Sequence, residues 1–180
     1  TDFIENIVAR TNAQHPDMVV ILGDFVDGSV ALRGKELLPL KKLSARYGVY
    51  GIPGNHEYYS GYREWMDFLP TLGIRMLQNS NVRLLDGKMV LAGVTDPAAF
   101  LRGGEVPSVK QSLTDVPHDA FKVLLAHQPH LVLRATEFDV GLQLSGHTHG
   151  GIVLGLNYLV ARYNSGFVSG FYRVGGTALY

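Results

Sequence analysis

Apolar residues along the chain follow two spacings, one typical of helices and one typical of strands. Residues 2–13 have apolar positions three and four apart, which predicts an amphipathic helix. Residues 18–22 (MVVIL) form a short apolar run closed by Gly23, which predicts a buried strand of a parallel sheet. Residues 31–46 return to the helical spacing, and residues 48–54 (GVYGIPG) predict a second strand.

The rest of the chain has shorter apolar runs separated by turn residues. Residues 60–72 and 130–138 predict two more helices, and the polar stretch 95–120 predicts a surface loop with one helical turn. Beyond Gly150 the pattern is strand-like, with little helical periodicity. Further strands are expected over 74–77, 82–85, 89–94, 122–126, 140–145, 170–174 and 177–180. This alternation of strands and helices predicts an α/β domain rather than an all-β one.

Composition narrows the classes of function. The chain has 180 residues, with 16 Lys and Arg against 16 Asp and Glu, and a neutral protein argues against a general binder of nucleic-acid backbones. It contains no cysteine, which excludes disulfide frameworks, thiolate zinc sites and cysteine nucleophiles. No apolar run approaches the roughly 20 residues that a membrane helix needs. The length suits one domain with its own core.

Polar residues that can bind metals follow four of the predicted strands, at the point where each strand ends. They are Asp24, Asp27, Asn55, His56, His127, His147 and His149. In open α/β sheets this edge is where ligands bind. Carboxylate, amide and imidazole ligands without thiolates suit Mn, Fe or Zn. A shared carboxylate with several histidines is also what a centre of two ions, about 3.5–4 Å apart, requires.

Four sequence motifs carry a family resemblance. GDFVDG (23–28), GNHE (54–57), His127 in LLAHQPH and GHTHGG (146–151) resemble, in the same order, the signature of the calcineurin-like metallophosphoesterases. GHTHGG and the ending VGGTALY are most similar to a bacterial branch whose members often carry an amino-terminal membrane anchor. The resemblance implies a single domain over residues 1–180. Its fold would be a four-layer α/β-β/α sandwich, in which two facing mixed sheets are flanked by helices.

The resemblance also implies a centre of two divalent ions, with Mn, Fe or Zn as the candidates. Asp24 would bridge both ions, Asn55, His127 and His147 would bind one of them, and His149 would bind the other. Residues two apart on an extended segment diverge, which allows His147 and His149 to reach different ions. The nucleophile would be a metal-activated hydroxide.

The same resemblance assigns the proton transfer. His56 would contact the phosphate and protonate the leaving group, and Asp27 would hold His56 by a hydrogen bond. Glu57 receives no role. The implied substrate is a phosphomonoester or phosphodiester, either a small molecule or a lipid head group.

One family motif is missing. The family begins with Asp-x-His on a strand upstream of the Gly-Asp pair, but only 22 residues precede Gly23 and none of them forms this motif. His15 and Asp17 lie in the reverse order on a short connection, so they do not replace it. The ion served by His149 therefore lacks two protein ligands. We expect a chain truncated at its amino end, and the apolar ending ALY favours truncation at the carboxyl end as well. The other interpretation is one incomplete metal site.

A second function stays open beside the hydrolase. The chain could be a non-catalytic or single-metal scaffold that keeps the phosphoesterase fold and acts as an interaction module. The missing Asp-x-His favours the scaffold, whereas the intact remaining ligands and His56 favour the enzyme. Taken alone, His127 would be as readily a core histidine as a ligand. The compartment stays open between a cytoplasmic protein and, if an upstream anchor exists, a membrane-associated one. The oligomeric state and the substrate do not follow from the sequence.

Overall fold

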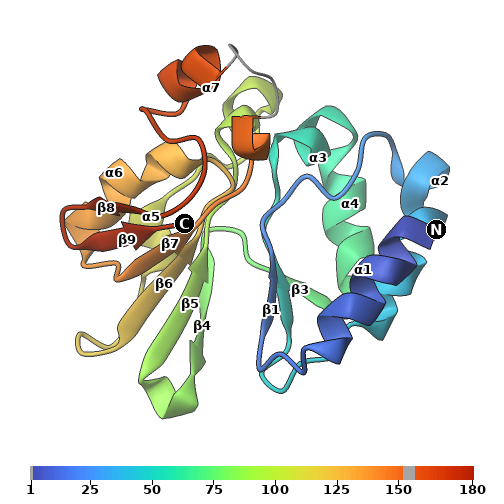
Figure 1. Ribbon diagram of the computed structural model, residues 1–180, viewed down its shortest axis with the longest axis horizontal. Helices are drawn as coiled ribbons and strands as arrows, with labels where there is room; N and C mark the ends of the chain where they lie inside the picture. Colours follow the sequence, from blue (N-terminus) through green and yellow to red (C-terminus); the bar gives the residue numbers. More distant parts are fainter. Residues whose placement is uncertain (1, 152–156) are drawn as a thin grey trace.

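The computed structural model of the chain describes residues 2–151 and 157–180, which form two β-sheets that face each other (Figure 1). The strands are β1 (Val19–Ile21), β2 (Val49–Gly51), β3 (Ile74–Met76), β4 (Ser80–Leu84), β5 (Met89–Gly93), β6 (Phe121–Leu125), β7 (Leu142–Leu144), β8 (Tyr172–Val174) and β9 (Thr177–Leu179). The smaller sheet has the order β1-β2-β3, and the larger sheet has the order β4-β5-β6-β7-β9-β8. The expected pair of sheets flanked by helices is confirmed.

Strand direction brings the carboxyl ends of most strands to one edge. Both pairs of the smaller sheet are parallel, so this sheet is parallel rather than mixed. In the larger sheet β5, β6, β7 and β9 run parallel, and only the outer pairs β4–β5 and β8–β9 are antiparallel. Because the two sheets also point the same way, the strand ends of both meet at the top of Figure 1.

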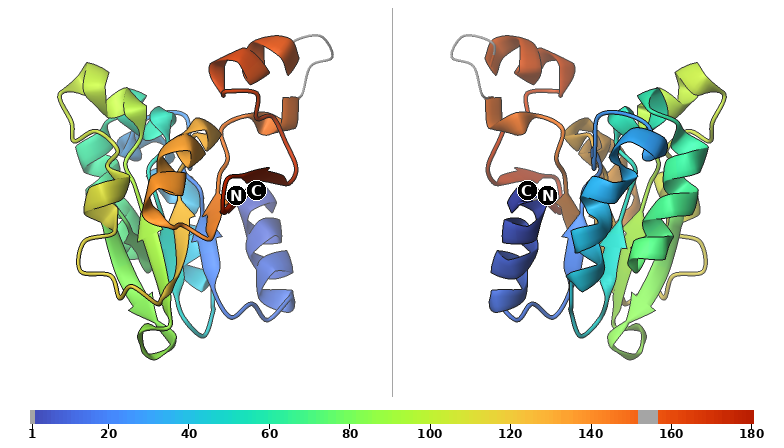
Figure 2. Two further views of the ribbon diagram at one scale, coloured as in Figure 1. Left: turned by 90° about the vertical axis from the view of Figure 1, so that its left-hand side faces the viewer. Right: turned by 90° about the vertical axis from the view of Figure 1, so that its right-hand side faces the viewer.

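Helices cover the outer faces of both sheets. The α-helices of the described residues are α1 (Asp2–Ala13), α2 (Val30–Arg33), α3 (Asn55–Tyr59), α4 (Tyr62–Phe68), α5 (Val109–Ser112), α6 (Val132–Ala135) and α7 (Asn157–Tyr163). Short 3₁₀ helices are η1 (Gly34–Lys42), η2 (Leu69–Leu72), η3 (Leu85–Gly87), η4 (Pro97–Arg102), η5 (Pro129–Leu131), η6 (Thr136–Phe138) and η7 (His149–Gly151). α1 and α4 lie on the smaller sheet, and α5 and α6 lie on the larger one. Figure 2 shows α7 standing above the strand ends, away from both sheets.

Side chains of the central strands pack alternately against the helices and against the other sheet. Ile21 of β1 packs among the helices, whereas its neighbours Val20 and Leu22 pack between the two sheets. In β6, Leu124 faces the helices and Leu125 faces the other sheet. Because successive side chains of a strand point to opposite faces, a strand covered on both sides must be apolar at every position. This explains the continuous apolar runs of the sequence.

Two predicted helices are shorter than expected because of their own residues. The helix predicted over 31–46 is α-helical only to Arg33 and continues as the 3₁₀ helix η1, which starts at Gly34 and contains Pro39. Proline removes a backbone donor and disfavours the α-helix before it, and glycine weakens a helix interior. The helix predicted over 60–72 similarly gives way to 3₁₀ structure before Pro70.

Two helices lie where none was expected. α3 begins at Asn55, directly after the predicted second strand. The prediction of little helical structure beyond Gly150 is wrong for α7, whose seven residues are too few to show a clear period. The tail strands β8 and β9 are confirmed. Within the described residues, no helix is both long and apolar enough to cross a membrane.

Candidate metal centre

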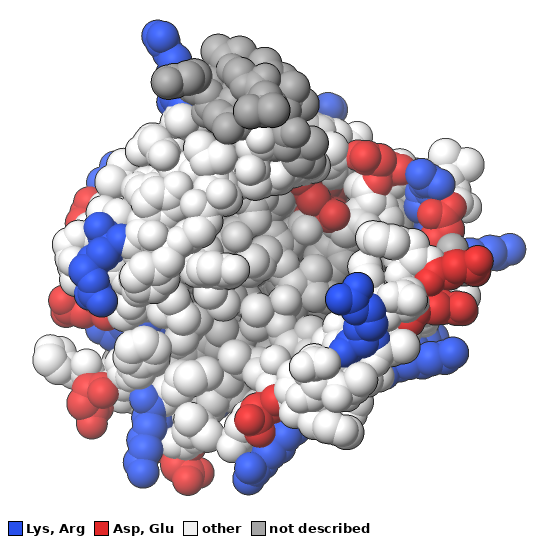
Figure 3. Space-filling model, in the orientation of Figure 1, with Lys and Arg blue, Asp and Glu red and all other residues white. Residues whose placement is uncertain are grey.

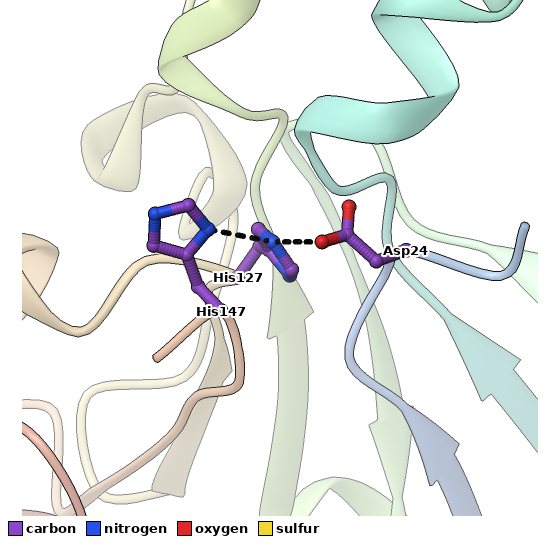
Figure 4. A group of neighbouring side chains, drawn as sticks. All are labelled: Asp24, His127 and His147. Atoms are coloured by element: carbon purple, nitrogen blue, oxygen red, sulfur yellow. Dashed lines mark hydrogen bonds and ion pairs between the residues drawn. The ribbon is translucent and has the colours of Figure 1, made fainter. Parts of the chain in front are cut away.

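Three of the predicted ligands point toward one another at the shared edge of the sheets (Figure 4). Asp24, His127 and His147 lie in the loops that follow β1, β6 and β7. Each offers one ligand atom, and these atoms all lie within 4.8 Å of one another. The cluster therefore joins the smaller sheet to the larger one.

Ring atom Nε2 of His127 is the centre of this cluster. It lies 3.1 Å from Oδ2 of Asp24, 3.1 Å from Oδ1 of Asn55 and 3.2 Å from Nδ1 of His147. Asn55 reaches this point because only residues 52–54 separate the end of β2 from the start of α3. Four predicted ligands from four different strands thus meet around one nitrogen atom.

A backbone hydrogen bond fixes the tautomer of His127. Its Nδ1 lies 2.6 Å from the carbonyl oxygen of Leu22, at the end of β1. A carbonyl can only accept, so Nδ1 carries the proton and donates it. In the neutral ring Nε2 is then a bare electron pair that faces the cluster. Histidines that bind metals are commonly held in this way by an outer partner.

The ligand loops have strained backbones. Asp24, His147 and His149 adopt positive φ angles of 53°, 68° and 50°. Such angles are uncommon for residues other than glycine and cost of order 1–3 kcal/mol each. Gly23, with φ of 89°, makes the turn that precedes Asp24, and a Cβ atom here would lie 2.5 Å from the backbone nitrogen of Gly54. Seven other non-glycine residues of the described chain also have positive φ angles, so these angles mark tight turns and do not by themselves identify a site.

Charge within the cluster shifts the pKa values of its members. Burial alone would raise the pKa of Asp24, but the hydrogen bond and charge of His127 outweigh it and hold the pKa below the usual value. Burial alone would lower the pKa of His127, but the hydrogen bond and charge of Asp24 raise it. Burial, then the charge of His127, lower the pKa of His147 to about 4. Asp24 and His127 therefore each favour the charged form of the other.

A divalent ion fits this donor set. Three atoms surround Nε2 of His127: an oxygen of Asp24, an oxygen of Asn55 and a nitrogen of His147. A single proton on Nε2 could form a hydrogen bond to only one of them. An ion accepts electron pairs from all of them. Carboxylate, amide and imidazole are ligands of Mn, Fe and Zn, and His127 at the centre of the set is only 2% exposed.

His56 and Asp27 lie beside the cluster. Nδ1 of His56 contacts Oδ1 of Asp27, and its Nε2 lies 3.8 Å from Oδ2 of Asp24. The backbone N–H of His56 donates to Oδ1 of Asp24 at 3.0 Å. Burial would lower the pKa of His56, but the hydrogen bond to Asp27 and the charge of Asp24 raise it above the usual value. The structure thus brings the predicted His–Asp pair together at the rim of the site.

His149 takes a different place from the other predicted ligands. It is exposed and does not belong to the group formed by Asp24, His127 and His147. All four line the same cavity of about 430 Å³, which continues to Phe167 in the loop before β8. His149 therefore faces the cavity of the cluster from its rim.

Comparison with known proteins now gives the family. Residues 1–151 match the proteins described as calcineurin-like phosphoesterases. The chain belongs to the calcineurin-like phosphoesterase family. An uncharacterized metallophosphoesterase of Campylobacter jejuni is 36% identical over 175 residues, which are 97% of this chain and 46% of that protein. A transmembrane protein with a metallophosphoesterase domain from Danio rerio is 36% identical over 95% of this chain and 41% of that protein.

The fold is also found in a solved structure. The sulfate thiohydrolase SoxB of Thermus thermophilus, in complex with glycerol, superposes with a TM-score of 0.50 and 18% identity. The match covers 98% of this chain and 36% of that protein, and it shows a shared fold. This calcineurin-like phosphoesterase chain spans a little under half the length of the curated relatives from Campylobacter and Danio.

Sequence reasoning missed two supporting groups of this candidate site. The carbonyl of Leu22 carries no sequence signal, because a backbone oxygen is the same in every residue. The Glu57 side chain received no role, yet the residue is fully buried and its carboxylate accepts backbone N–H groups of both ligand turns. Its position three residues after Gly54, which precedes α3, matches the capping pattern at a helix start and could have indicated a buried role.

Proposed function

We propose that the chain performs metal-dependent hydrolysis of phosphomonoester or phosphodiester bonds. The observation that supports this most is the meeting of Asp24, Asn55 and His147 around Nε2 of His127. Asp24 and His147, the two members farthest apart in the sequence, are separated by 123 positions. Local turn formation does not account for such a cluster, whereas binding of a common ion does.

The ligands divide between two ions in this proposal. Asp24 serves both, Asn55, His127 and His147 hold one, and His149 serves the other, with Mn, Fe or Zn as candidates. Bound divalent ions would supply an activated water as the nucleophile and withdraw charge from the phosphoryl oxygens. Within residues 1–180, the second ion has only Asp24 and His149 as proposed ligands, and the Asp-x-His motif is absent.

The His56 side chain acts as the proton donor to the leaving oxygen. It stands next to the cluster and is 36% exposed, so a substrate can reach it. Asp27 holds Nδ1, which leaves Nε2 directed toward the cluster side, where it lies 3.8 Å from Asp24. The carboxylate also favours the protonated ring, which is the form that a proton donor needs. General acid catalysis of this kind contributes about 10²–10⁴-fold.

The substrate is proposed only as a class, a phosphate ester. Figure 3 shows a hollow between the two sheets with Lys and Arg scattered around its rim, and the described residues form no continuous basic patch on this face. A nucleic-acid substrate is therefore disfavoured on this face, because it would need phosphate-binding cations along its path. The Danio relative is named as a transmembrane protein, which makes the phosphate ester of a lipid head group one candidate beside small molecules.

Hydrolysis of p-nitrophenyl phosphate and of bis(p-nitrophenyl) phosphate with added Mn²⁺ tests the proposal. Asn55→Ala and His149→Ala are expected to lose activity, because each removes a ligand atom. His118→Ala, at an exposed histidine outside the centre, is the matched control and should keep full activity. Full activity in both ligand variants would refute the proposed metal centre.

A scaffold function is the alternative, because the Asp-x-His motif is absent from residues 1–180. Under that alternative the wild-type chain binds one ion through the Asp24 cluster and hydrolyses neither substrate. Measuring bound metal by elemental analysis together with hydrolysis therefore separates the two functions. One equivalent of metal without turnover of either ester would favour the scaffold.

A further inference from the structure

Glu57 is a fully buried carboxylate with no role in the proposed chemistry. It is the third residue of α3, and its relative exposure is 0%. Burying a carboxylate is costly unless hydrogen bonds stabilise it, and such groups in folded proteins are paired or accept donors. The partners of Glu57 therefore indicate what the residue does.

The Glu57 carboxylate accepts three backbone N–H groups from two separate turns. Oε2 accepts the N–H of Asp24 at 3.0 Å and the N–H of Gly54 at 2.7 Å, and Oε1 accepts the N–H of Phe25 at 2.8 Å. Asp24 and Phe25 belong to the turn after β1, and Gly54 belongs to the turn after β2. One side chain therefore ties together the two turns that carry Asp24 and Asn55.

The two turns are pressed against each other where Glu57 holds them. A Cβ atom on Gly23 would lie 2.5 Å from the nitrogen of Gly54, and a Cβ atom on Gly54 would overlap the Asp24 carboxylate. Asp24 also has a strained positive φ of 53°. A strained conformation persists only where surrounding contacts enforce it, and the hydrogen bonds of Glu57 to this turn are such contacts.

We propose that Glu57 is a positioning residue that clamps the Asp24 and Asn55 turns into the geometry that binds metal. This inference rests on the proposed function, because the ion is the ligand for which the turns are positioned. Glu57 does not contact the ion or the substrate. Its effect passes through the backbone of Asp24, Phe25 and Gly54.

The substitution Glu57→Gln tests the clamp with almost no change in volume. A glutamine has one acceptor oxygen, so it can keep the pair of bonds to Asp24 and Gly54 or the single bond to Phe25. Its amide nitrogen then faces a backbone N–H, and two donors repel. We expect one turn to be released and metal affinity to fall about 10–100-fold, as for the loss of outer-shell partners in other metal sites. Glu64→Gln makes the same chemical change on the exposed face of α4 and is the control.

The first measurement is amide hydrogen exchange of the metal-free chain, which does not depend on the proposed function. In the wild type, the amides of Asp24, Phe25 and Gly54 should be protected. In Glu57→Gln, protection at these amides should fall by about tenfold or more, the factor that corresponds to losing about 1.4 kcal/mol. The core of β5 and β6 should keep its protection. Unprotected amides in the wild type, or equal loss of protection throughout the chain, would overturn the clamp.

The second measurement is a Co²⁺ titration followed by visible absorption, which reports both affinity and ligand geometry. We expect weaker binding and a changed spectrum in Glu57→Gln, and wild-type behaviour in Glu64→Gln. Equal affinity and spectrum in all three proteins would contradict the clamp. If the wild type binds no ion, the proposed function fails, and the exchange experiment still decides whether Glu57 holds the turns. If Glu57→Gln does not fold, Glu57→Asp keeps the charge on a shorter side chain and takes its place in both measurements.

Discussion

Replacing Asp24 by Asn tests the metal centre most directly. Asn has nearly the same size, and its Oδ1 can still accept the backbone N–H of His56, which lies 3.0 Å from that atom in the wild type. The substitution removes the negative charge that faces His127 at 3.1 Å. The fold should therefore survive, while the attraction for a divalent ion is lost.

The expected magnitude follows from binding linkage. An ion at about 100 times its dissociation constant stabilises the folded chain by about 2.7 kcal/mol. For chains of about 150–250 residues, each kcal/mol shifts the melting temperature by about 2–4 °C. The wild-type protein, with 180 residues, should thus melt about 5–11 °C higher with saturating Mn²⁺ than without it. At the same Mn²⁺ concentration the Asp24→Asn shift should be close to zero.

The assay is thermal unfolding followed by circular dichroism, with and without Mn²⁺ at constant ionic strength. Comparing each protein with itself cancels any intrinsic effect of the substitution on stability. Asp67→Asn, at an exposed position of α4, is the control and should show the wild-type shift. If Asp24→Asn shifts as much as the wild type, the ion binds elsewhere and the proposed centre is wrong.

Three other substitutions test the proton donor, the close contact between two turns and a hydrogen bond of the core. Asp27→Asn removes a group that raises the pKa of His56. A proton donor works below its pKa, so the alkaline fall of the pH–rate profile should move to lower pH, and an unmoved profile would count against this role. Gly54→Ala would push a methyl group into the carboxylate of Asp24. The free energy of unfolding in urea should therefore fall by about 1–3 kcal/mol. An unchanged urea midpoint would contradict the tight contact. Trp65→Phe removes the Nε1 donor to the carbonyl of Gly28 at 3.1 Å. The free energy of unfolding, measured by urea unfolding with circular dichroism, should fall by about 1–3 kcal/mol. Stability equal to the wild type would show that this bond contributes little.

The strands and the meeting of the ligands were predictable because both depend on patterns that are local in sequence. Buried parallel strands must be apolar throughout, and their carboxyl ends must meet at one edge. From these two rules it follows that Asp24, His127 and His147 lie near one another, as the structure shows. The place of His149 at the cavity rim depends on the turn at Gly150, with its φ of 64°, and no spacing rule specifies that turn.

Other features depend on partners that are distant in sequence. The role of Glu57 arises from N–H groups 32 and 33 residues away, and a pattern search along the chain does not detect them. The 3₁₀ structure of η1 could have been anticipated from Pro39, but Leu37 and Leu40 are three residues apart, a spacing that also occurs on one face of an α-helix. The α7 helix has only seven residues, which is fewer than two helical turns, so it shows little periodicity along the sequence. Its Tyr and Val residues also favour strands.

The hydrogen bond between His127 and the carbonyl of Leu22 has a consequence for the order of folding. The two residues are 105 positions apart, and the His127–Asn55 pair is 72 positions apart. Such contacts close long loops, and we expect them to form after the separate sheets. Contacts that form after the rate-limiting step of folding act mainly on the rate of unfolding. An ion bound at this seam would therefore extend the lifetime of the native chain without hastening its formation.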